Sequence, residues 1–129
     1  MTSLEDTEYA IREMQVRGAP LIGVTAAFGM YLASIKNSSN EFMEKSGIFL
    51  KNARPTAVNL SWAINKILHE IKNIDVDKRK SFILNMAKKI RKDDIEACKK
   101  IGEYGSSFIE KIYNNKKSTV NILTHCNAG

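Results

Sequence analysis

The chain has 129 residues, of which 43% are hydrophobic and 26% are charged. These values are typical of one soluble globular domain and exclude a disordered, collagen-like or disulfide-dense chain. The formal net charge of +6 favours anionic partners, but the lysine-rich stretches lack interleaved aromatic residues, so we expect solvated helix faces and no nucleic-acid partner.

The first part of the chain predicts three helices. Ser3, with Asp6 three positions later, forms an entry similar to a capping box for the first helix. Pro20 suits the first turn of a second helix, in which apolar residues cover nearly every face. A polar loop then leads to a short helix over residues 42–50. Because apolar residues cover nearly every face of the second helix, we expect this helix at the centre of the fold.

Two further helices follow. Pro55 marks the start of a fourth helix, whose apolar residues repeat with the 3.6-residue period and end near Asn73. Asp75 or Asp77 can cap a long helical region that runs towards Ile112. The chain therefore predicts a mostly α-helical fold.

The end of this long region raises three expectations. Gly102 and Gly105 bend the helix or allow another helix to pack closely. Cys98 lies between apolar helix positions and is expected in the core. Residues 119–124 form the one clear strand pattern of the sequence. We therefore predict a helical N-terminal domain over residues 1–117 and the first strand of a second, α/β domain over residues 118–129.

The sequence gives no sign of a membrane or secretory segment. The most apolar stretch, residues 21–35, is interrupted by glycine and polar residues and is too short to span a bilayer. The N-terminus carries acidic residues instead of the basic region of a signal peptide. We expect a cytoplasmic protein with no membrane partner.

Two arginines stand just before helix starts. Arg17 precedes the helix that begins at Pro20, and Arg54 precedes the next well-marked one, although the positive end of a helix dipole disfavours cations. A bound anion would make both positions favourable, because free N–H groups, Gly18 and a guanidinium form a phosphate site. Alternatively, each arginine points to solvent or reaches a carboxylate such as Glu13, and Gly18 is only a turn residue.

Four motifs occur in order along the chain. Residues 17–23 read RGAPLIG and are followed by AAFG at 26–29; residues 54–60 read RPTAVNL, 101–105 read IGEYG, and 123–129 read LTHCNAG. These segments resemble the methylthioribose-1-phosphate isomerases, which are relatives of the regulatory subunits of translation initiation factor 2B. The resemblance extends over almost the whole chain.

The resemblance implies a helical N-terminal domain joined to a Rossmann-like C-terminal domain. It also implies an aldose–ketose isomerisation of 5-methylthioribose 1-phosphate in methionine salvage, with no metal or nucleotide cofactor. Arg17, Gly18 and Ala19 match the first phosphate-contacting loop of the family, and Arg54 matches its second phosphate-binding arginine. The expected ligand is therefore a sugar 1-phosphate.

The catalytic cysteine and aspartate of the family lie in later segments, so we expect no catalytic residue in this chain. Cys126 matches a site-shaping cysteine at the end of the first Rossmann strand, and His125 and Asn127 belong to the same motif. The chain is expected to be an N-terminal portion that needs a missing C-terminal half or a second protomer, since the family suggests a homodimer.

Two alternatives stay open. The chain can be a non-catalytic regulatory or sugar-phosphate-binding module similar to the initiation-factor relatives. It can also belong to a sister isomerase that acts on 5-deoxyribose 1-phosphate or ribose 1,5-bisphosphate. The pocket for the 5-substituent of the sugar would separate the isomerases.

Overall fold

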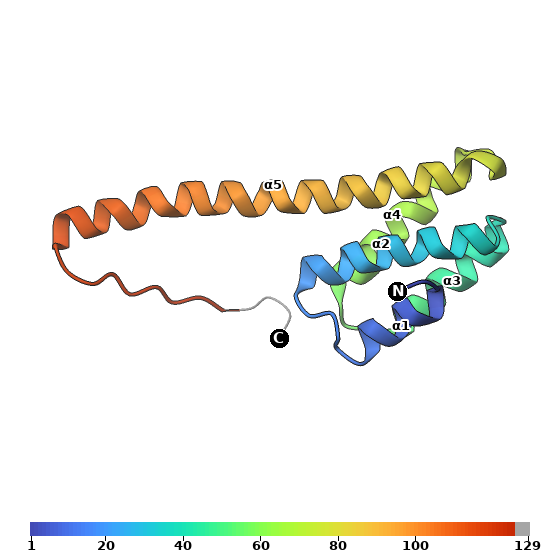
Figure 1. Ribbon diagram of the computed structural model, residues 1–129, viewed down its shortest axis with the longest axis horizontal. Coiled ribbons are helices and arrows are strands. Elements are labelled where there is room, and N and C mark those ends of the chain that lie inside the picture. The colour runs from blue at the N-terminus through green and yellow to red at the C-terminus, as the bar shows by residue number, and fades with distance from the viewer. Residues whose placement is uncertain (126–129) are drawn as a thin grey trace.

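The computed structural model describes residues 1–125, and in this range it contains helices and no strand. Figure 1 shows a cluster of helices from which the last one extends far beyond the others. In chain order the elements are α1 (Leu4–Arg12), α2 (Ala19–Lys36), α3 (Asn40–Ala53), α4 (Val58–Glu70), the 3-10 helix η1 (Ile71–Asn73) and α5 (Val76–Lys116). The prediction of a mostly helical N-terminal portion is confirmed.

Helix α2 is the centre of the core, as its sequence predicts. It contacts α1, α3, α4 and α5, and ten of its residues are buried: Ile22, Gly23, Val24, Thr25, Ala26, Ala27, Gly29, Met30, Ala33 and Ser34. Among the described residues it is the one helix long and apolar enough to cross a membrane. The helix has 18 residues, so the expectation that this apolar segment is too short to cross a membrane does not hold. However, 56% of the helix is buried inside the structure, as in the core helix of a soluble protein.

Serine caps define the starts of α1 and α3. Ser3 Oγ accepts a hydrogen bond from the backbone N–H of Asp6 at 3.0 Å, which confirms the predicted entry. Ser39 Oγ accepts one from the N–H of Phe42 at 3.4 Å. Each bond satisfies a helix-start N–H that has no partner within the helix. Because of the second cap, α3 begins earlier and is longer than the predicted range 42–50.

Pro55 does not start a helix, contrary to the prediction. Residues 54–57 form a turn in which the N–H of Ala57 donates to the carbonyl of Arg54 at 3.0 Å, and α4 begins only at Val58. Proline fixes a φ angle that suits a turn as well as a first helical turn, so the sequence did not distinguish the two.

Arg79 connects the start of α5 to the loop between α2 and α3. The residue is only 4% exposed. Its Nε donates to the carbonyl of Ile74 at 2.9 Å, and its guanidinium also donates to the carbonyl of Ser38 at 2.8 Å. A buried arginine is tolerated when its donors are satisfied in this way. The bonds fix the direction in which α5 leaves the domain.

Only the first part of α5 packs against the other helices. Its buried residues are Arg79, Ile83, Ala87 and Ile90, and Figure 1 shows the rest of this 41-residue helix extending away from the domain. Cys98 is exposed, so its predicted place in the core is wrong. Its apolar neighbours suggested burial, but no described element covers this part of the helix.

The far part of α5 carries apolar side chains that no described element covers. We define the exposed α5 face as Ile101 (72% exposed), Tyr104 (70%), Phe108 (65%) and Ile112 (49%). The helix continues through Gly102 and Gly105 without interruption, and no described atom outside the adjoining residues and backbone of α5 lies within 4 Å of the Cβ position of either glycine. Neither glycine ends the helix or supports close helix packing within the described residues.

The predicted strand over residues 119–124 is not found. After Lys117, which ends α5 with a φ of 52°, the described residues to 125 form no strand and run back in the direction of the helical domain (Figure 1). A strand requires a neighbour to complete its hydrogen bonds, and the described residues offer none. Ile122 and Leu123 are 68% and 99% exposed.

Candidate functional site

The starts of α2 and α4 lie against each other, and a glycine makes this possible. A Cβ atom on Gly23 would stand 2.9 Å from the backbone oxygen of Asn59 and 3.3 Å from its Cβ. Any larger residue would therefore push the two helices apart. The sequence interpretation treated Gly23 only as an interruption of an apolar stretch and missed this contact.

Neither helix start is closed by a side chain. Gly18, the residue before α2, has a φ of 100°, which only glycine adopts readily. Its carbonyl accepts a hydrogen bond from the N–H of Ile22 at 3.0 Å, but neither Gly18 nor Ala57, the residue before α4, provides a capping side chain. The first N–H groups of both helices are thus available to a ligand.

The two starts enclose a small hollow, which we call the helix-start hollow. It measures about 50 Å³ and is lined by Ala19, Ile22, Arg54, Thr56, Ala57, Val58 and Asn59. Two helix dipoles with their positive ends nearby and a guanidinium in the wall favour an anion. The small volume favours a compact one, such as a phosphate group.

The structure separates the two arginines that the sequence paired. Arg54 is half-buried and lines the helix-start hollow. Arg17 is exposed and is not among the lining residues, although it directly precedes Gly18. In residues 1–125 neither guanidinium forms a hydrogen bond or ion pair. Glu13, the alternative partner considered for Arg17, instead pairs with Arg12.

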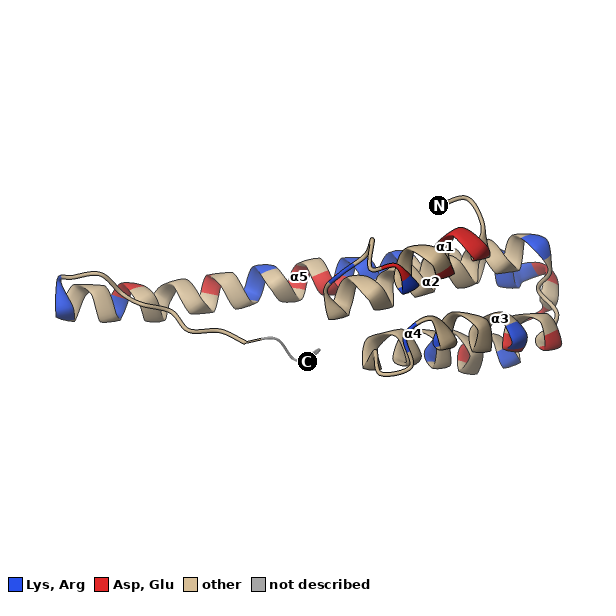
Figure 2. Ribbon diagram, turned by 90° about the horizontal axis from the view of Figure 1, so that it is seen from below, with Lys and Arg blue, Asp and Glu red and all other residues tan. Residues whose placement is uncertain are grey.

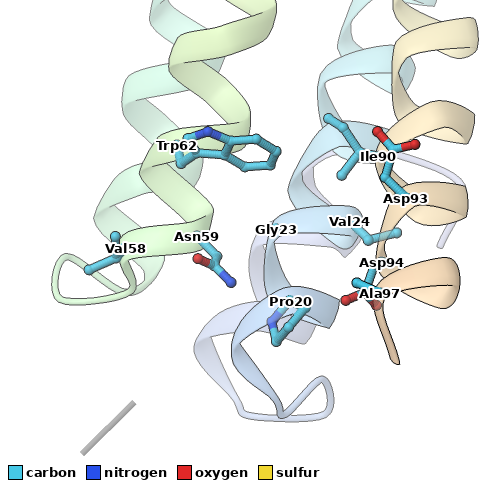
Figure 3. A pocket seen from close by; sticks show the side chains of 10 residues that line it. All are labelled: Pro20, Gly23, Val24, Val58, Asn59, Trp62, Ile90, Asp93, Asp94 and Ala97. Carbon is cyan, nitrogen blue, oxygen red and sulfur yellow. The ribbon is translucent and has the colours of Figure 1, made fainter. Parts of the chain in front are cut away.

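A second, larger hollow adjoins the first, and we call it the α5 hollow. It measures about 430 Å³. Figure 3 shows its residues on three helices, with α4 on one side, α2 in the middle and α5 on the other. The lining residues are Pro20, Gly23, Val24, Val58, Asn59, Trp62, Ile90, Asp93, Asp94 and Ala97. Val58 and Asn59 belong to the walls of both hollows.

The sequence interpretation did not single out Trp62, Asp93 and Asp94, which line the α5 hollow. Trp62 follows Asn59 by about one helical turn, so its presence near the RPTAVNL motif could have been noticed. Asp93 and Asp94 could not, because their position depends on how α5 crosses α2. Figure 2 shows acidic and basic segments interleaved along α5, so these two carboxylates do not stand out in the sequence from the other charges of the helix.

Of three further predicted residues, one lies away from both hollows and two lie outside the described residues. His125 is exposed at the end of the described chain and lines neither hollow. Cys126 and Asn127 lie outside the described residues. In the described part of the chain, no group of three or more His, Cys, Asp or Glu side chains could hold a metal ion.

Comparison with known proteins places the chain among a large set of relatives. Residues 15–129 match the Initiation factor 2 subunit family. The chain is 42% identical over its whole length to a methylthioribose-1-phosphate isomerase of Methylorubrum extorquens, of which it covers 35%. It is also 50% identical, over 97% of its length, to a putative methylthioribose-1-phosphate isomerase of Methanocaldococcus jannaschii, of which it covers 33%. The chain thus spans about a third of these relatives.

Two solved structures are similar to this one. The first is 5-methylthioribose 1-phosphate isomerase from Pyrococcus horikoshii, with a TM-score of 0.75 and 39% identity over 81% of the chain and 32% of that protein. The second is translation initiation factor eIF-2B subunit delta from A. fulgidus, with a TM-score of 0.76 and 33% identity over 84% of the chain and 34% of that protein. Both enzymes and translation factors therefore share this arrangement of helices.

Proposed function

Because the chain belongs to the Initiation factor 2 subunit family, we propose that it is the phosphate-binding, N-terminal part of a methylthioribose-1-phosphate isomerase. The names of relatives at 42% and 50% identity support this choice. The chain spans 35% of the first of them, so the activity of the whole enzyme is part of the proposal.

One observation carries the proposal, namely the meeting of two uncapped helix starts and Arg54 around a compact hollow. A sugar 1-phosphate would place its phosphate there, with N–H donors from Ala19, Val58 and Asn59. Arg54 supplies a charge-assisted hydrogen bond from the wall. Gly18 and Arg17 form the outer edge of the loop, from which Arg17 reaches the phosphate only after its side chain moves inward.

The contribution of this part to catalysis is positioning. Converting the aldose 1-phosphate into the ketose 1-phosphate moves hydrogen between C1 and C2 with no net oxidation, and it requires the sugar to be held in one orientation. The catalytic cysteine and aspartate that the family resemblance implies would come from outside this chain. No cofactor is needed for the proposed reaction.

The proposed partner is a C-terminal Rossmann-like half or a second protomer that supplies it. The exposed α5 face supports this, since Ile101, Tyr104 and Phe108 are each at least 65% exposed, and contiguous apolar surface of this kind marks an interaction site. The complete enzyme is proposed to work in the cytoplasm on a soluble sugar phosphate, with neither nucleic acid nor membrane as partner.

Titration calorimetry with ribose 1-phosphate tests the phosphate site. Arg54→Ala is expected to weaken binding by about 1.5–3 kcal/mol, the value of a hydrogen bond to a charged group. Arg91→Ala, which removes an exposed arginine that lines neither hollow, is the control and is expected to leave the affinity unchanged. If the two variants lose the same affinity, the loss comes from the change in net charge alone, and the proposed phosphate site is contradicted.

Turnover of methylthioribose 1-phosphate tests the enzymatic role. We expect no activity from this chain alone and measurable activity after mixing with a separately expressed C-terminal portion of a relative. The Arg54→Ala chain in the same mixture should have a lower kcat/KM. An active chain without the C-terminal portion would show that the proposed division of roles is wrong.

The alternative function is a non-catalytic, sugar-phosphate-binding or regulatory module. The TM-score of 0.76 to an initiation-factor subunit favours keeping this candidate. The two functions differ in the mixing experiment, because the module binds a sugar phosphate but gives no turnover with any C-terminal portion. The RGAP motif at residues 17–20 and the HCNAG motif at residues 125–129 favour the isomerase.

A further inference from the structure

We propose that the far part of α5, which we define as residues 97–116, opens locally in the chain without a partner and stays helical when a partner covers the exposed α5 face. The opening is a property of this chain alone and does not depend on any substrate. Only the identity of the partner, a C-terminal portion, rests on the proposed function. Local opening makes this segment the place at which a protease cuts the unaccompanied chain.

The far part of α5 receives no support from the helical core. The last buried residue of the helix is Ile90, and none of residues 97–116 is buried. Figure 1 shows no other helix of the described chain beside this part of α5. Because helices in proteins owe most of their stability to the packing of an apolar face, the far part lacks the main stabilising contribution.

Side-chain interactions also give the far part little support. Within the described chain, residues 97–116 form no ion pair, and the nearest one along α5 joins Lys92 to Glu96 at 3.6 Å. Lys111 Nζ lies 5.8 Å from the centre of the Phe108 ring. A cation–π contact at such an exposed position is weak, so it does not replace the missing packing.

The sequence of the far part disfavours an isolated helix. Gly102 and Gly105 lie inside it, and a glycine lowers helix formation about fivefold relative to alanine. No described atom outside the adjoining residues and backbone of α5 lies within 4 Å of either Cβ position, so packing does not require these glycines. Short isolated helices are only marginally stable in water even when they are rich in alanine. The far part should therefore open much more often than the packed part of the same helix.

The exposed α5 face links closing of the helix to binding. Its four residues, Ile101, Tyr104, Phe108 and Ile112, follow one another at intervals of three or four positions. They therefore share one side only when residues 97–116 are helical. A partner that binds this side favours the closed state, because the open state offers no matching surface. Without the partner, the open state presents extended backbone to proteases.

Limited digestion with trypsin tests the opening, because cleavage after lysine requires a locally open chain. The helix provides its own comparison: Lys88 and Lys89 are exposed in the packed part, and Lys100 and Lys111 are exposed in the far part. We expect cleavage after Lys100 and Lys111 to be at least about a hundredfold faster than after Lys88 and Lys89. Equal rates at the four lysines, or cleavage at none of them, would overturn the proposal.

Substitution of the two glycines tests the cause of the opening. Gly102→Ala with Gly105→Ala is expected to slow cleavage after Lys111 about ten- to thirtyfold, since each alanine raises helix formation about fivefold. The matched control is Asn85→Ala, which places an alanine at an exposed position in the packed part of α5 and is expected to change this rate less than about twofold. Equal slowing in the two variants would mean that α5 opens as one unit, which contradicts an independent far part.

Digestion in the presence of a C-terminal portion of a relative tests the effect of covering the face. In a mixture that turns over methylthioribose 1-phosphate, cleavage after Lys111 is expected to slow at least about tenfold. Unchanged cleavage in an active mixture would contradict the coupling between helix closure and partner binding. A mixture without turnover would contradict the proposed function instead, and digestion of the chain alone would still decide whether the far part opens.

Discussion

Arg54 and Arg17 occupy similar places in the sequence but different places in the structure. Arg54 is half-buried in the wall of the helix-start hollow, whereas Arg17 is exposed beside it. A bond from a partly buried guanidinium is screened less by water than one from an exposed guanidinium. We therefore expect the loss of Arg54 to cost more phosphate affinity than the loss of Arg17.

Exchanging the two arginines for alanine separately tests this order. Arg54→Ala is expected to weaken ribose 1-phosphate binding by at least about 1 kcal/mol more than Arg17→Ala, since exposed ion pairs contribute about 0–1 kcal/mol. Binding constants at two salt concentrations provide the measurement, and the loss in Arg17→Ala should shrink further at high salt. A larger loss for Arg17→Ala would mean that the loop closes differently around the ligand.

Gly18 and Gly102 give a second pair of substitutions with opposite expected effects. Gly18 has a φ of 100°, so Gly18→Val is expected to destabilise the fold by about 1–3 kcal/mol and to weaken phosphate binding. Gly102 is in an exposed helix with open space around it, so Gly102→Ala is expected to stabilise by about 0.5–1 kcal/mol. Urea unfolding measures the change in the free energy of unfolding for both variants. Equal changes would show that the loop at Gly18 tolerates side chains.

At the level of the helices, the close contact of α2 and α4 is the feature on which the site depends. Gly23→Ala places a Cβ 2.9 Å from the Asn59 oxygen, and we expect it to cost about 1–3 kcal/mol of unfolding free energy, as overpacking does. Because the helix starts move apart, affinity for phosphate should fall too. Gly105→Ala, with no neighbour within 4 Å, is the control and should be neutral or stabilising.

Arg79 offers an independent test of how α5 is attached. Arg79→Ala leaves the half-buried carbonyls of Ile74 and Ser38 without their donor, and we expect a loss of about 1–3 kcal/mol in total, because leaving an acceptor away from water unsatisfied is costly. The same substitution at exposed Arg91 should change stability by less than about 0.5 kcal/mol. Denaturant midpoints distinguish the two, and similar midpoints would mean that water replaces the Arg79 bonds.

Periodicity predicted the helices well but not every boundary or partner. The apolar pattern located α2 and α4, and the Ser3 cap was predicted from its side-chain chemistry. The pattern failed at Pro55, because a turn and a helix start use proline equally well. It also failed at Cys98 and residues 119–124, because an apolar helix face or strand pattern does not specify the surface that covers it.

The candidate site was predictable only in part, because some of its residues are brought together by contacts between distant parts of the chain. Local chemistry predicted Gly18 and Arg54, because each directly precedes a helix start in the sequence. The place of Asp93 and Asp94 in the wall of the α5 hollow depends on the packing of α5 across α2. This contact joins residues about 70 positions apart in the chain, and a single sequence does not reveal it. Gly23 was missed because close backbone approach has the same sequence signal as a helix interruption.

At the scale of the whole molecule, the first part of α5 packs against the other helices, and its far part carries the exposed α5 face. We predict that Ile101→Glu and Phe108→Glu leave the unfolding free energy within about 0.5 kcal/mol of the unchanged chain, because both side chains are exposed. The same variants should prevent productive mixing with a C-terminal portion. Normal turnover of the mixture would place the partner elsewhere. A large loss of stability would mean that the face is already covered.

A nuclear magnetic resonance titration of the 129-residue chain with ribose 1-phosphate tests the phosphate site most directly. The amide signals of Ala19, Leu21, Val58 and Asn59 should shift together with one binding constant, and Arg54→Ala should weaken that binding. Changes confined to the lysine-rich surface of α5, or no change at the helix starts, would contradict a phosphate site formed where α2 and α4 meet.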